Sequence, residues 1–223
     1  MSEKMSEFFG SAGRSFASMR SDDLVRLIFD EPDTAVGLLD ETGRILRTNR
    51  IAARLFENEP RIEGQRLNDI LPADYAEERV EFINQALDTN ERIDVLSMFR
   101  GELFLTSWVP LQSVEIGHSV VLARSRPVPK RPDSDTRLVY ARKNDLGPLA
   151  RLTPGELEVL TMIGMGMTTP AIAQRLNRKE KTIEWRRASL GKKLQVTTRV
   201  ELASIAIRAG LAHFMSVGDP SRP

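Results

Sequence analysis

The chain has 223 residues, of which 41% are hydrophobic and 28% are charged, and its net charge at pH 7 is +1. The absence of cysteine excludes disulfides, thiolate metal sites and cysteine nucleophiles, and two histidines are too few for an ordinary zinc site. No apolar run approaches the ~20 residues of a transmembrane helix, and the first residues lack the apolar centre of a secretory signal. We therefore expect a cytoplasmic protein that does not interact with membranes.

The charges are unevenly distributed along the chain. Residues 1–124 carry 14 Lys and Arg against 22 Asp and Glu, whereas residues 151–223 carry 12 against 6. Such an asymmetry indicates two units with different partners, the basic one being suited to a polyanion. Between them, the proline-rich stretch "SRPVPKRPDSD" predicts an extended linker over residues 125–147.

The acidic half has a mixed pattern of predicted elements. Residues 1–30 form a leader whose stretch "SDDLVRLIFD" is typical of a helix, because Leu24, Leu27 and Ile28 share one face. This helix either mediates dimerisation or covers the sheet that follows. Alternating and apolar runs predict strands at residues 34–40, 44–49, 92–99, 102–111 and 118–124, and helical spacing predicts helices at residues 50–56 and 72–87.

This order of elements, with "GLLDETGRILRTNRIAARLF" and "IEGQRLNDILP", resembles a PAS domain over residues 31–124. The resemblance implies a five-stranded antiparallel sheet with helices on one face, and a role in sensing or dimerisation. A flavin adduct needs a cysteine, which is absent, and the common haem ligand is a helical histidine, whereas His118 opens a predicted strand. We therefore expect no cofactor, and the sequence identifies no ligand.

Four apolar residues of the predicted strands have two possible roles. Met98, Phe99, Phe104 and Trp108 either line a ligand pocket or form the packed core on one face of the sheet. The core is the simpler interpretation, because apolar strand residues are usually packed.

The basic half predicts four short helices. "LTPGELEVL" opens the first with a capping box, in which Thr153 precedes Pro154 and Glu156 lies three residues further on. A second helix begins near Thr168, a short turn at residues 177–179 follows, and a third helix spans residues 181–194. The fourth starts at a second capping box, formed by Thr198 and Glu201, and ends before Gly210.

The segments "LTPGELEVL", "GMTTPAIAQRL", "KTIEWRRASLGKKLQV" and "TRVELASIAIRAGL" together resemble the LuxR-type (GerE-like) DNA-binding domain over residues 148–214. The resemblance implies an all-α helix-turn-helix domain that binds DNA in the major groove. The overall prediction is thus an α+β chain with a PAS-like domain, a linker, this all-α domain and a tail at 215–223. The sequence departs from the family pattern at Ala171, Arg178, Lys179 and Arg186.

The third helix carries the candidate DNA contacts. Its spacing points Ile183, Leu190 and Leu194 inward and leaves residues 184, 185, 188 and 192 on the opposite face. By resemblance, the base-facing residues are Glu184, Trp185 and Ala188. The expected phosphate contacts are Lys181, Thr182, Arg187, Lys192, Lys193 and Arg199.

Two of these residues leave alternatives open. Glu184 could accept a hydrogen bond from a cytosine amino group or pair with Arg187 three residues on. Trp185 could contact DNA, the PAS-like unit or a second subunit.

We predict a DNA-binding transcriptional regulator that acts as a homodimer on double-stranded DNA, with RNA polymerase as a possible partner. Its PAS-like domain would receive a signal or mediate dimerisation. The alternative is a signalling module whose helical unit binds a protein in place of DNA. An enzyme is not expected, because the sequence has no phosphate loop, metal cluster or nucleophile–base pattern.

Overall fold

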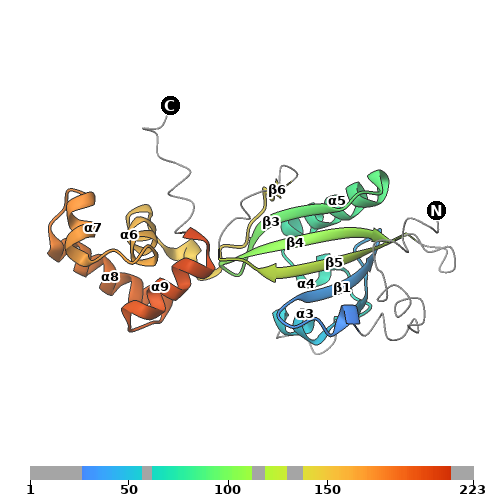
Figure 1. The fold of residues 1–223 in the computed structure, drawn as a ribbon, viewed down its shortest axis with the longest axis horizontal. Helices are drawn as coiled ribbons and strands as arrows, with labels where there is room; N and C mark the ends of the chain where they lie inside the picture. Colours follow the sequence, from blue (N-terminus) through green and yellow to red (C-terminus); the bar gives the residue numbers. More distant parts are fainter. Residues whose placement is uncertain (1–26, 57–61, 112–118, 130–137, 212–223) are drawn as a thin grey trace, which may run out of the picture.

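The computed structural model describes residues 27–56, 62–111, 119–129 and 138–211. A sheet domain is followed by a helical domain, and the two lie end to end along the long axis of the molecule (Figure 1). Most of the predicted leader lies outside the described residues. No helix within the described ranges is long and apolar enough to cross a membrane.

The sheet has six strands, one more than predicted. They are β1 (Ala35–Asp40), β2 (Ile45–Thr48), β3 (Ile93–Phe99), β4 (Glu102–Leu111), β5 (Val120–Pro127) and β6 (Leu138–Tyr140). Their spatial order is β2-β1-β5-β4-β3-β6, and every neighbouring pair is antiparallel except β3 and β6, which are parallel. The five predicted antiparallel strands are confirmed.

The additional strand comes from the segment predicted to be a linker. Leu138 and Val139 point to opposite faces of the sheet, and each packs against an apolar cluster there. Just beyond β6, the buried Glu78 carboxylate accepts hydrogen bonds from the backbone N–H groups of Arg142 (2.7 Å) and Lys143 (2.9 Å). These contacts attach residues 138–143 to the sheet domain, so this part of the segment is not an extended connector.

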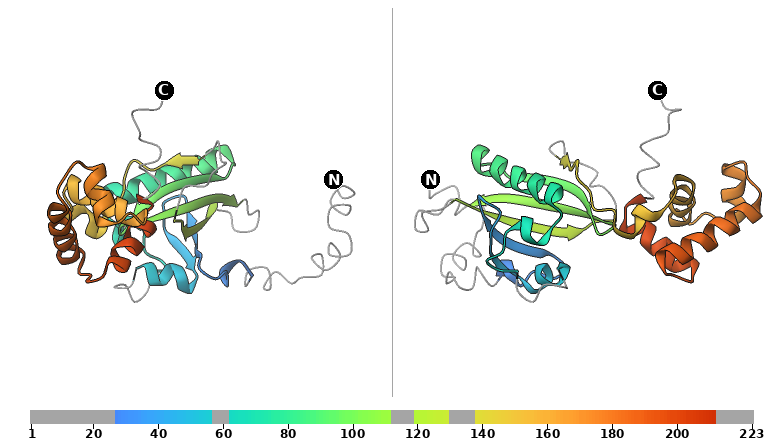
Figure 2. Two further views of the ribbon diagram at one scale, coloured as in Figure 1. Left: turned by 60° about the vertical axis from the view of Figure 1, so that its left-hand side comes forward. Right: turned by 180° about the vertical axis from the view of Figure 1, so that it is seen from behind.

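Helices cover one face of the sheet. They are α3 (Arg50–Leu55), α4 (Leu67–Ile70) and α5 (Ala73–Thr89), and Figures 1 and 2 show them on the same side. The first and last were predicted, whereas α4 is too short to show a helical period. Ile83 of α5 packs with Val95 and Trp108 of the sheet, and this cluster forms the core of the domain.

Strand alternation separates the aromatic residues from Met98. Phe99, Phe104 and Trp108 stand on the helix-covered face, whereas Met98 stands on the other. Met98 packs instead against the core of the helical domain. It is therefore a residue of the boundary between the domains.

The helical domain contains the four predicted helices after a short 3₁₀ helix. They are η1 (Gly147–Arg151), α6 (Pro154–Gly164), α7 (Thr169–Arg175), α8 (Glu180–Leu194) and α9 (Arg199–Arg208). Both predicted capping boxes form, at the starts of α6 and α9. A Cβ on Gly164 would lie 2.6 Å from the Cβ of Ala206, so only glycine allows α6 and α9 to approach this closely.

The two domains meet at the tight turn between β3 and β4. Arg100 and Gly101 form this turn with φ values of 51° and 81°, as two-residue hairpins require. Next to it, Arg208 Nε lies 3.1 Å from Glu102 Oε1, and a Cβ on Gly210 would lie 2.6 Å from Leu103 Cδ2. The hairpin therefore contacts the end of α9 directly.

Candidate nucleic-acid interface

Helix α8 has one buried and one exposed row, as its spacing predicts. Ile183, Leu190 and Leu194 are buried in the core of the helical domain. The opposite row is exposed, and it consists of Glu184, Trp185, Ala188 and Lys192. Trp185 is 69% exposed, which is unusual for an indole and leaves it available to another molecule.

A third row of α8 ties the helix to the start of α6. Arg186 Nη1 donates to the carbonyl oxygen of Gly155 (3.1 Å). Ser189 Oγ and Lys193 Nζ donate to the Glu156 carboxylate at 2.7 and 2.6 Å. These residues recur at intervals of three and four, so they lie along one face. They set the angle at which α8 presents its exposed row.

Glu156 is the centre of this attachment and is only 4% exposed. Its carboxylate also accepts hydrogen bonds from the backbone N–H (2.8 Å) and hydroxyl (2.9 Å) of Thr153. Burial by itself raises the pKa of the Glu156 carboxyl, but the hydrogen bonds from Lys193, Ser189 and Thr153 outweigh it and lower the pKa to about 2. The group is therefore an anion at neutral pH, and it holds the Lys193 ammonium.

The candidate phosphate contacts fall into two groups. Lys181, Arg187 and Lys192 form no ion pair with another described residue, and Thr182 lies on the same turn as Lys181. Arg187 and Lys192 line one cleft beside Ala188, at the turn from α8 to α9.

The remaining two candidates already have partners within the domain. Lys193 is bound to Glu156 and to the carbonyl oxygen of Arg151 (3.1 Å). Arg199 donates to the carbonyl oxygen of Met167. The structure thus leaves Lys181, Arg187 and Lys192 without ion pairs to described residues, brings Arg187 and Lys192 to one cleft, and gives Lys193 and Arg199 contacts within the domain.

The structure also narrows the alternatives for Glu184 and Trp185. Among the described residues, Glu184 forms no ion pair, so the contact with Arg187 is not made. The exposure of Trp185 excludes its packing against the sheet domain in this structure. Base contact by Glu184 therefore stays a prediction, as does contact of Trp185 with DNA or with a second subunit.

Sequence reasoning missed the cluster of Glu156, Ser189 and Lys193. From the sequence, Glu156 is predicted only to belong to a capping box, three residues after Thr153. The signal that could have found the cluster is the spacing of Arg186, Ser189 and Lys193, which places three donors beside the buried row.

The start of α8 lacks a capping side chain. Lys179 is the N-cap residue, with φ −74° and ψ 144°, and its side chain accepts no hydrogen bond. A serine there would accept from a free backbone N–H of the first turn, and it would remove a positive charge from the positive end of the helix. We expect Lys179→Ser to stabilise the chain by about 0.5–1 kcal/mol, measured by urea unfolding. Lys179→Ala is the control, and an equal gain from it would contradict the capping explanation.

Both domains match known families. Residues 150–206 match the family of bacterial regulatory proteins, luxR family, and residues 29–126 match the PAS fold. No curated protein sequence matches the chain.

Three of the solved structures to which this chain is similar match different lengths of it. Vibrio cholerae VqmA in complex with ligand and DNA is 16% identical over 87% of this chain and 90% of its own, with a TM-score of 0.45. Phage VqmA in complex with DPO is 19% identical over 91% of each chain, with a TM-score of 0.45. The PAS domain of histidine kinase ThkA is 25% identical over 42% of this chain and 97% of its own, with a TM-score of 0.36.

The fold and the exposed basic helix define a helix-turn-helix DNA-binding protein that carries a PAS-fold domain in front. The match at residues 150–206 is to the luxR family of bacterial regulatory proteins, and this domain together with the PAS-fold domain is the architecture of a DNA-binding transcription regulator.

Proposed function

We propose that α8 enters the major groove and that two copies of the chain bind a two-fold site. In this arrangement Glu184, Trp185 and Ala188 face the bases. Lys181, Thr182, Arg187 and Lys192 contact phosphates and supply the sequence-independent affinity. Lys193 mainly holds α8 in place through Glu156, and Arg199 mainly holds the start of α9 in place through the carbonyl oxygen of Met167. Each of them contacts phosphate only if it releases this internal partner.

The observation that carries this proposal is the division of α8 into three rows. One row is buried, one is attached to α6 through Glu156, and the third is exposed and retains its cations. Because a helix-turn-helix inserts the N-terminal part of its second helix, this exposed row is the one that meets DNA.

A homodimer is supported by apolar residues at the start of the described chain. Leu27 is 62% exposed and Ile28 is 40% exposed, which suits burial against a second copy. We also propose that the regulator acts in the cytoplasm, performs no catalysis and contacts RNA polymerase.

The contact between the domains offers a route from the PAS-fold domain to α8. The β3–β4 hairpin carries Phe99 on the helix-covered face of the sheet, and Leu103 of the same hairpin lies against Gly210. A shift of the hairpin would therefore move the end of α9, which packs against α6. We propose that the sensor state changes the spacing of the two recognition helices in this way.

The salt dependence of DNA affinity tests the proposal. Each phosphate neutralised in duplex DNA contributes a slope of about −0.9 to the plot of log affinity against log salt concentration. Three available cations in each of two subunits predict a slope of about −5, whereas one subunit alone predicts about −3. Fluorescence anisotropy with DNA fragments selected from a random pool provides the measurement. A flat slope would refute DNA binding, and a slope near −3 would refute the dimer.

A further inference from the structure

The segment between β6 and the helical domain follows β3 to the end of that strand, and we call residues 141–147 the strap. The backbone N–H of Ala141 donates to the carbonyl oxygen of Leu96 (3.0 Å), and that of Asp145 donates to the carbonyl oxygen of Met98 (3.1 Å). The strap therefore runs beside β3 from β6 to the β3–β4 hairpin, where the helical domain begins (Figure 1).

Asp145 makes four hydrogen bonds, and three of them reach the hairpin. Besides its bond to Met98, its carbonyl oxygen accepts from the backbone N–H of Gly101 (3.0 Å), and its carboxylate Oδ2 accepts from that of Arg100 (3.1 Å). The other carboxylate oxygen, Oδ1, accepts from the backbone N–H of Gly147 (2.9 Å). One side chain thus joins the tip of the hairpin to the first residue of η1.

Two glycines bring the strap and the hairpin into direct contact. A Cβ on Gly147 would lie 2.6 Å from the carbonyl carbon of Arg100, and a Cβ on Gly101 would lie 2.9 Å from the carbonyl oxygen of Leu146. The φ values of Gly147 and Gly101 are 49° and 81°, a region that residues with a Cβ rarely adopt. The two backbones therefore touch with no side chain between them.

The strap is also held by helix α5. The Glu78 carboxylate, which accepts from the backbone N–H groups of Arg142 and Lys143, belongs to a side chain that is only 3% exposed. The neighbouring Arg79 donates to the carbonyl oxygen of Lys143 (3.3 Å). Because α5 and the hairpin hold different residues of the strap, the strap cannot slide along β3 without breaking both sets of hydrogen bonds.

No free connector separates the strap from the helical domain. Gly147 belongs both to the strap and to η1, and Leu149 of η1 is buried in the core of the helical domain. A Cβ on Gly101 would lie 3.6 Å from Leu149 Cγ, so the hairpin also contacts this core directly. Domains that are joined by a flexible connector normally move relative to each other, and the strap removes this freedom.

We propose that Asp145 holds the helical domain in one orientation relative to the sheet domain, and that it thereby sets the distance between the half-sites that a dimer can bind. The two recognition helices of a dimer then have one spacing, and they cannot both reach half-sites at another spacing. The spacing rests on the proposed function, since it requires two copies on a two-fold site. The fixed orientation itself requires neither DNA nor a dimer.

The orientation can be measured on the full chain, because the chain has no cysteine and nitroxide labels attach only where cysteines are introduced. Gln85→Cys on α5 and Gln174→Cys on α7 are exposed positions in the two domains. Double electron–electron resonance, with labelled chain diluted in unlabelled chain, should give one narrow distribution of label distances. Asp145→Ala removes the carboxylate bonds to Arg100 and Gly147 and should broaden this distribution. Asp145→Asn should have an intermediate effect, because an amide has one acceptor oxygen.

Asp74→Ala is the matched control. Asp74 is also a carboxylate beside the strap, and it lies 3.3 Å from Lys143 Nζ. Both side chains of this pair are about half exposed or more (49% and 63%), so the pair contributes little and its loss should leave the distribution narrow. Gly147→Ala is a second variant of the joint that keeps the Asp145 carboxylate. Its Cβ would push the chain away from Arg100 and should broaden the distribution.

DNA fragments that carry the same two half-sites at different spacings test the second part of the proposal. Linking two binding modules raises affinity by about 10²–10⁴-fold, and this gain is lost where the geometry prevents both from binding. A change of about five base pairs, half a turn of DNA, should therefore weaken binding of the parent chain about 100-fold or more. Asp145→Ala should lose about tenfold or less, because its helical domains can reach both half-sites at either spacing. A variant that is merely less stable would lose affinity equally at the two spacings.

The proposal is overturned if the parent chain itself gives a broad distance distribution, or if Asp145→Ala leaves the distribution narrow. It is also overturned if Asp74→Ala broadens the distribution as much as Asp145→Ala, or if the parent chain and Asp145→Ala lose the same factor between the two spacings. If the chain bound DNA through one helical domain only, the proposed two-fold site would be wrong. The label distances would still decide whether Asp145 fixes the orientation of the domains.

Discussion

Replacing Glu156 with glutamine should destabilise the helical domain by about 2–4 kcal/mol. The amide would remove the charge that holds Lys193, and its NH₂ group would face a hydrogen-bond donor. Glu156 Oε2 lies 2.6 Å from Lys193 Nζ, and Oε1 accepts from Ser189. Urea unfolding of the full chain, followed by circular dichroism, gives the change in the free energy of unfolding.

The second capping box provides a matched control. Glu201 makes the same local contacts as Glu156, since it accepts from the backbone N–H and hydroxyl of Thr198, both at 2.8 Å. It is exposed and binds no cation among the described residues. Glu201→Gln should therefore cost much less than Glu156→Gln. Equal losses would mean that capping alone, and not the link to α8, explains the role of Glu156.

The same site makes the stability of the helical domain depend on pH. The folded pKa of Glu156 is lowered from 4.5 to about 2, so its stabilisation is present above pH 4.5 and is lost as the pH falls towards 2. A shift of this size corresponds to about 3 kcal/mol. The melting temperatures of the parent chain and of Glu156→Gln should therefore converge between pH 4.5 and 2. A constant difference across this range would contradict the lowered pKa.

Lys192→Ala should weaken binding about equally on every DNA sequence, whereas Glu184→Ala should mainly relax the preference for particular bases. A dimer loses two phosphate contacts in the first variant, so the salt slope should become less steep by about 2. A specific carboxylate contact contributes about 1–3 kcal/mol of discrimination at one base pair. Binding to a library of randomised sites, at two salt concentrations, measures both effects. Equal losses of specificity from the two variants would refute this division.

Lys193 is the matched control for Lys192, because the two are adjacent and carry the same charge. Lys193 is bound to Glu156, whereas Lys192 is exposed and has no ion pair with a described residue. Lys193→Ala should therefore lower the free energy of unfolding while changing the salt slope little. If Lys193→Ala changed the slope as much as Lys192→Ala, its ammonium would have to leave Glu156 in the complex with DNA.

The order of helices and strands could be predicted from the sequence, because most of these elements begin or end at residues that act on their immediate neighbours in the chain. Capping boxes at Thr153 and Thr198 mark helix starts through contacts that span three residues. Strand β6 carries no comparable signal. Its three residues become a strand because β3 supplies a partner and Glu78 holds the backbone that follows, and both lie far away in the chain.

The sequence alone was sufficient to predict which residues of α8 form its exposed row. The apolar residues Ile183, Leu190 and Leu194 must be buried together, and the helical period then places Glu184 and Trp185 on the opposite face. Composition also indicated which half of the chain would meet a polyanion, because net charge needs no coordinates.

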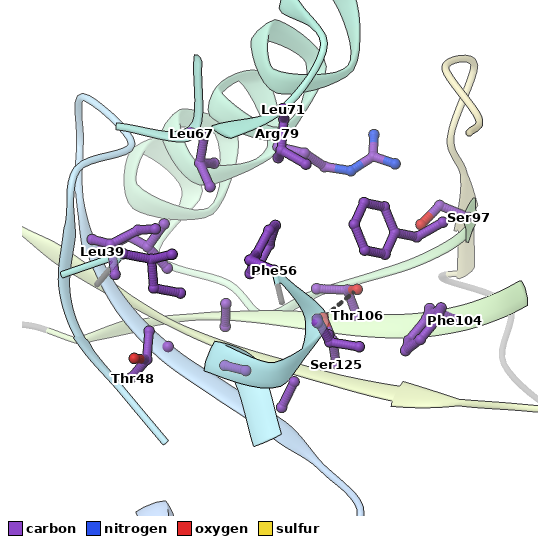
Figure 3. Close-up of a pocket in the computed structure, with 18 of the residues that line it drawn as sticks. Leu39, Thr48, Phe56, Leu67, Leu71, Arg79, Ser97, Phe104, Thr106 and Ser125 are labelled. Atoms are coloured by element: carbon purple, nitrogen blue, oxygen red, sulfur yellow. Dashed lines mark hydrogen bonds between the residues drawn. The ribbon is translucent and has the colours of Figure 1, made fainter. Parts of the chain in front are cut away.

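Only the tertiary structure determines which lysine and arginine side chains are free to contact DNA and which are bound within the protein. Lys192 and Lys193 are neighbours of identical charge, and only the position of Glu156 on another helix distinguishes them. The same applies to the pocket of about 120 Å³ between the helices and the sheet (Figure 3), where a strand period assigns Ser97, Thr106 and Trp108 to one face. Whether that face is filled or left open depends on how closely the helices approach the sheet. Ion pairs and cavities arise from contacts between distant segments, and a local pattern carries no measure of those distances.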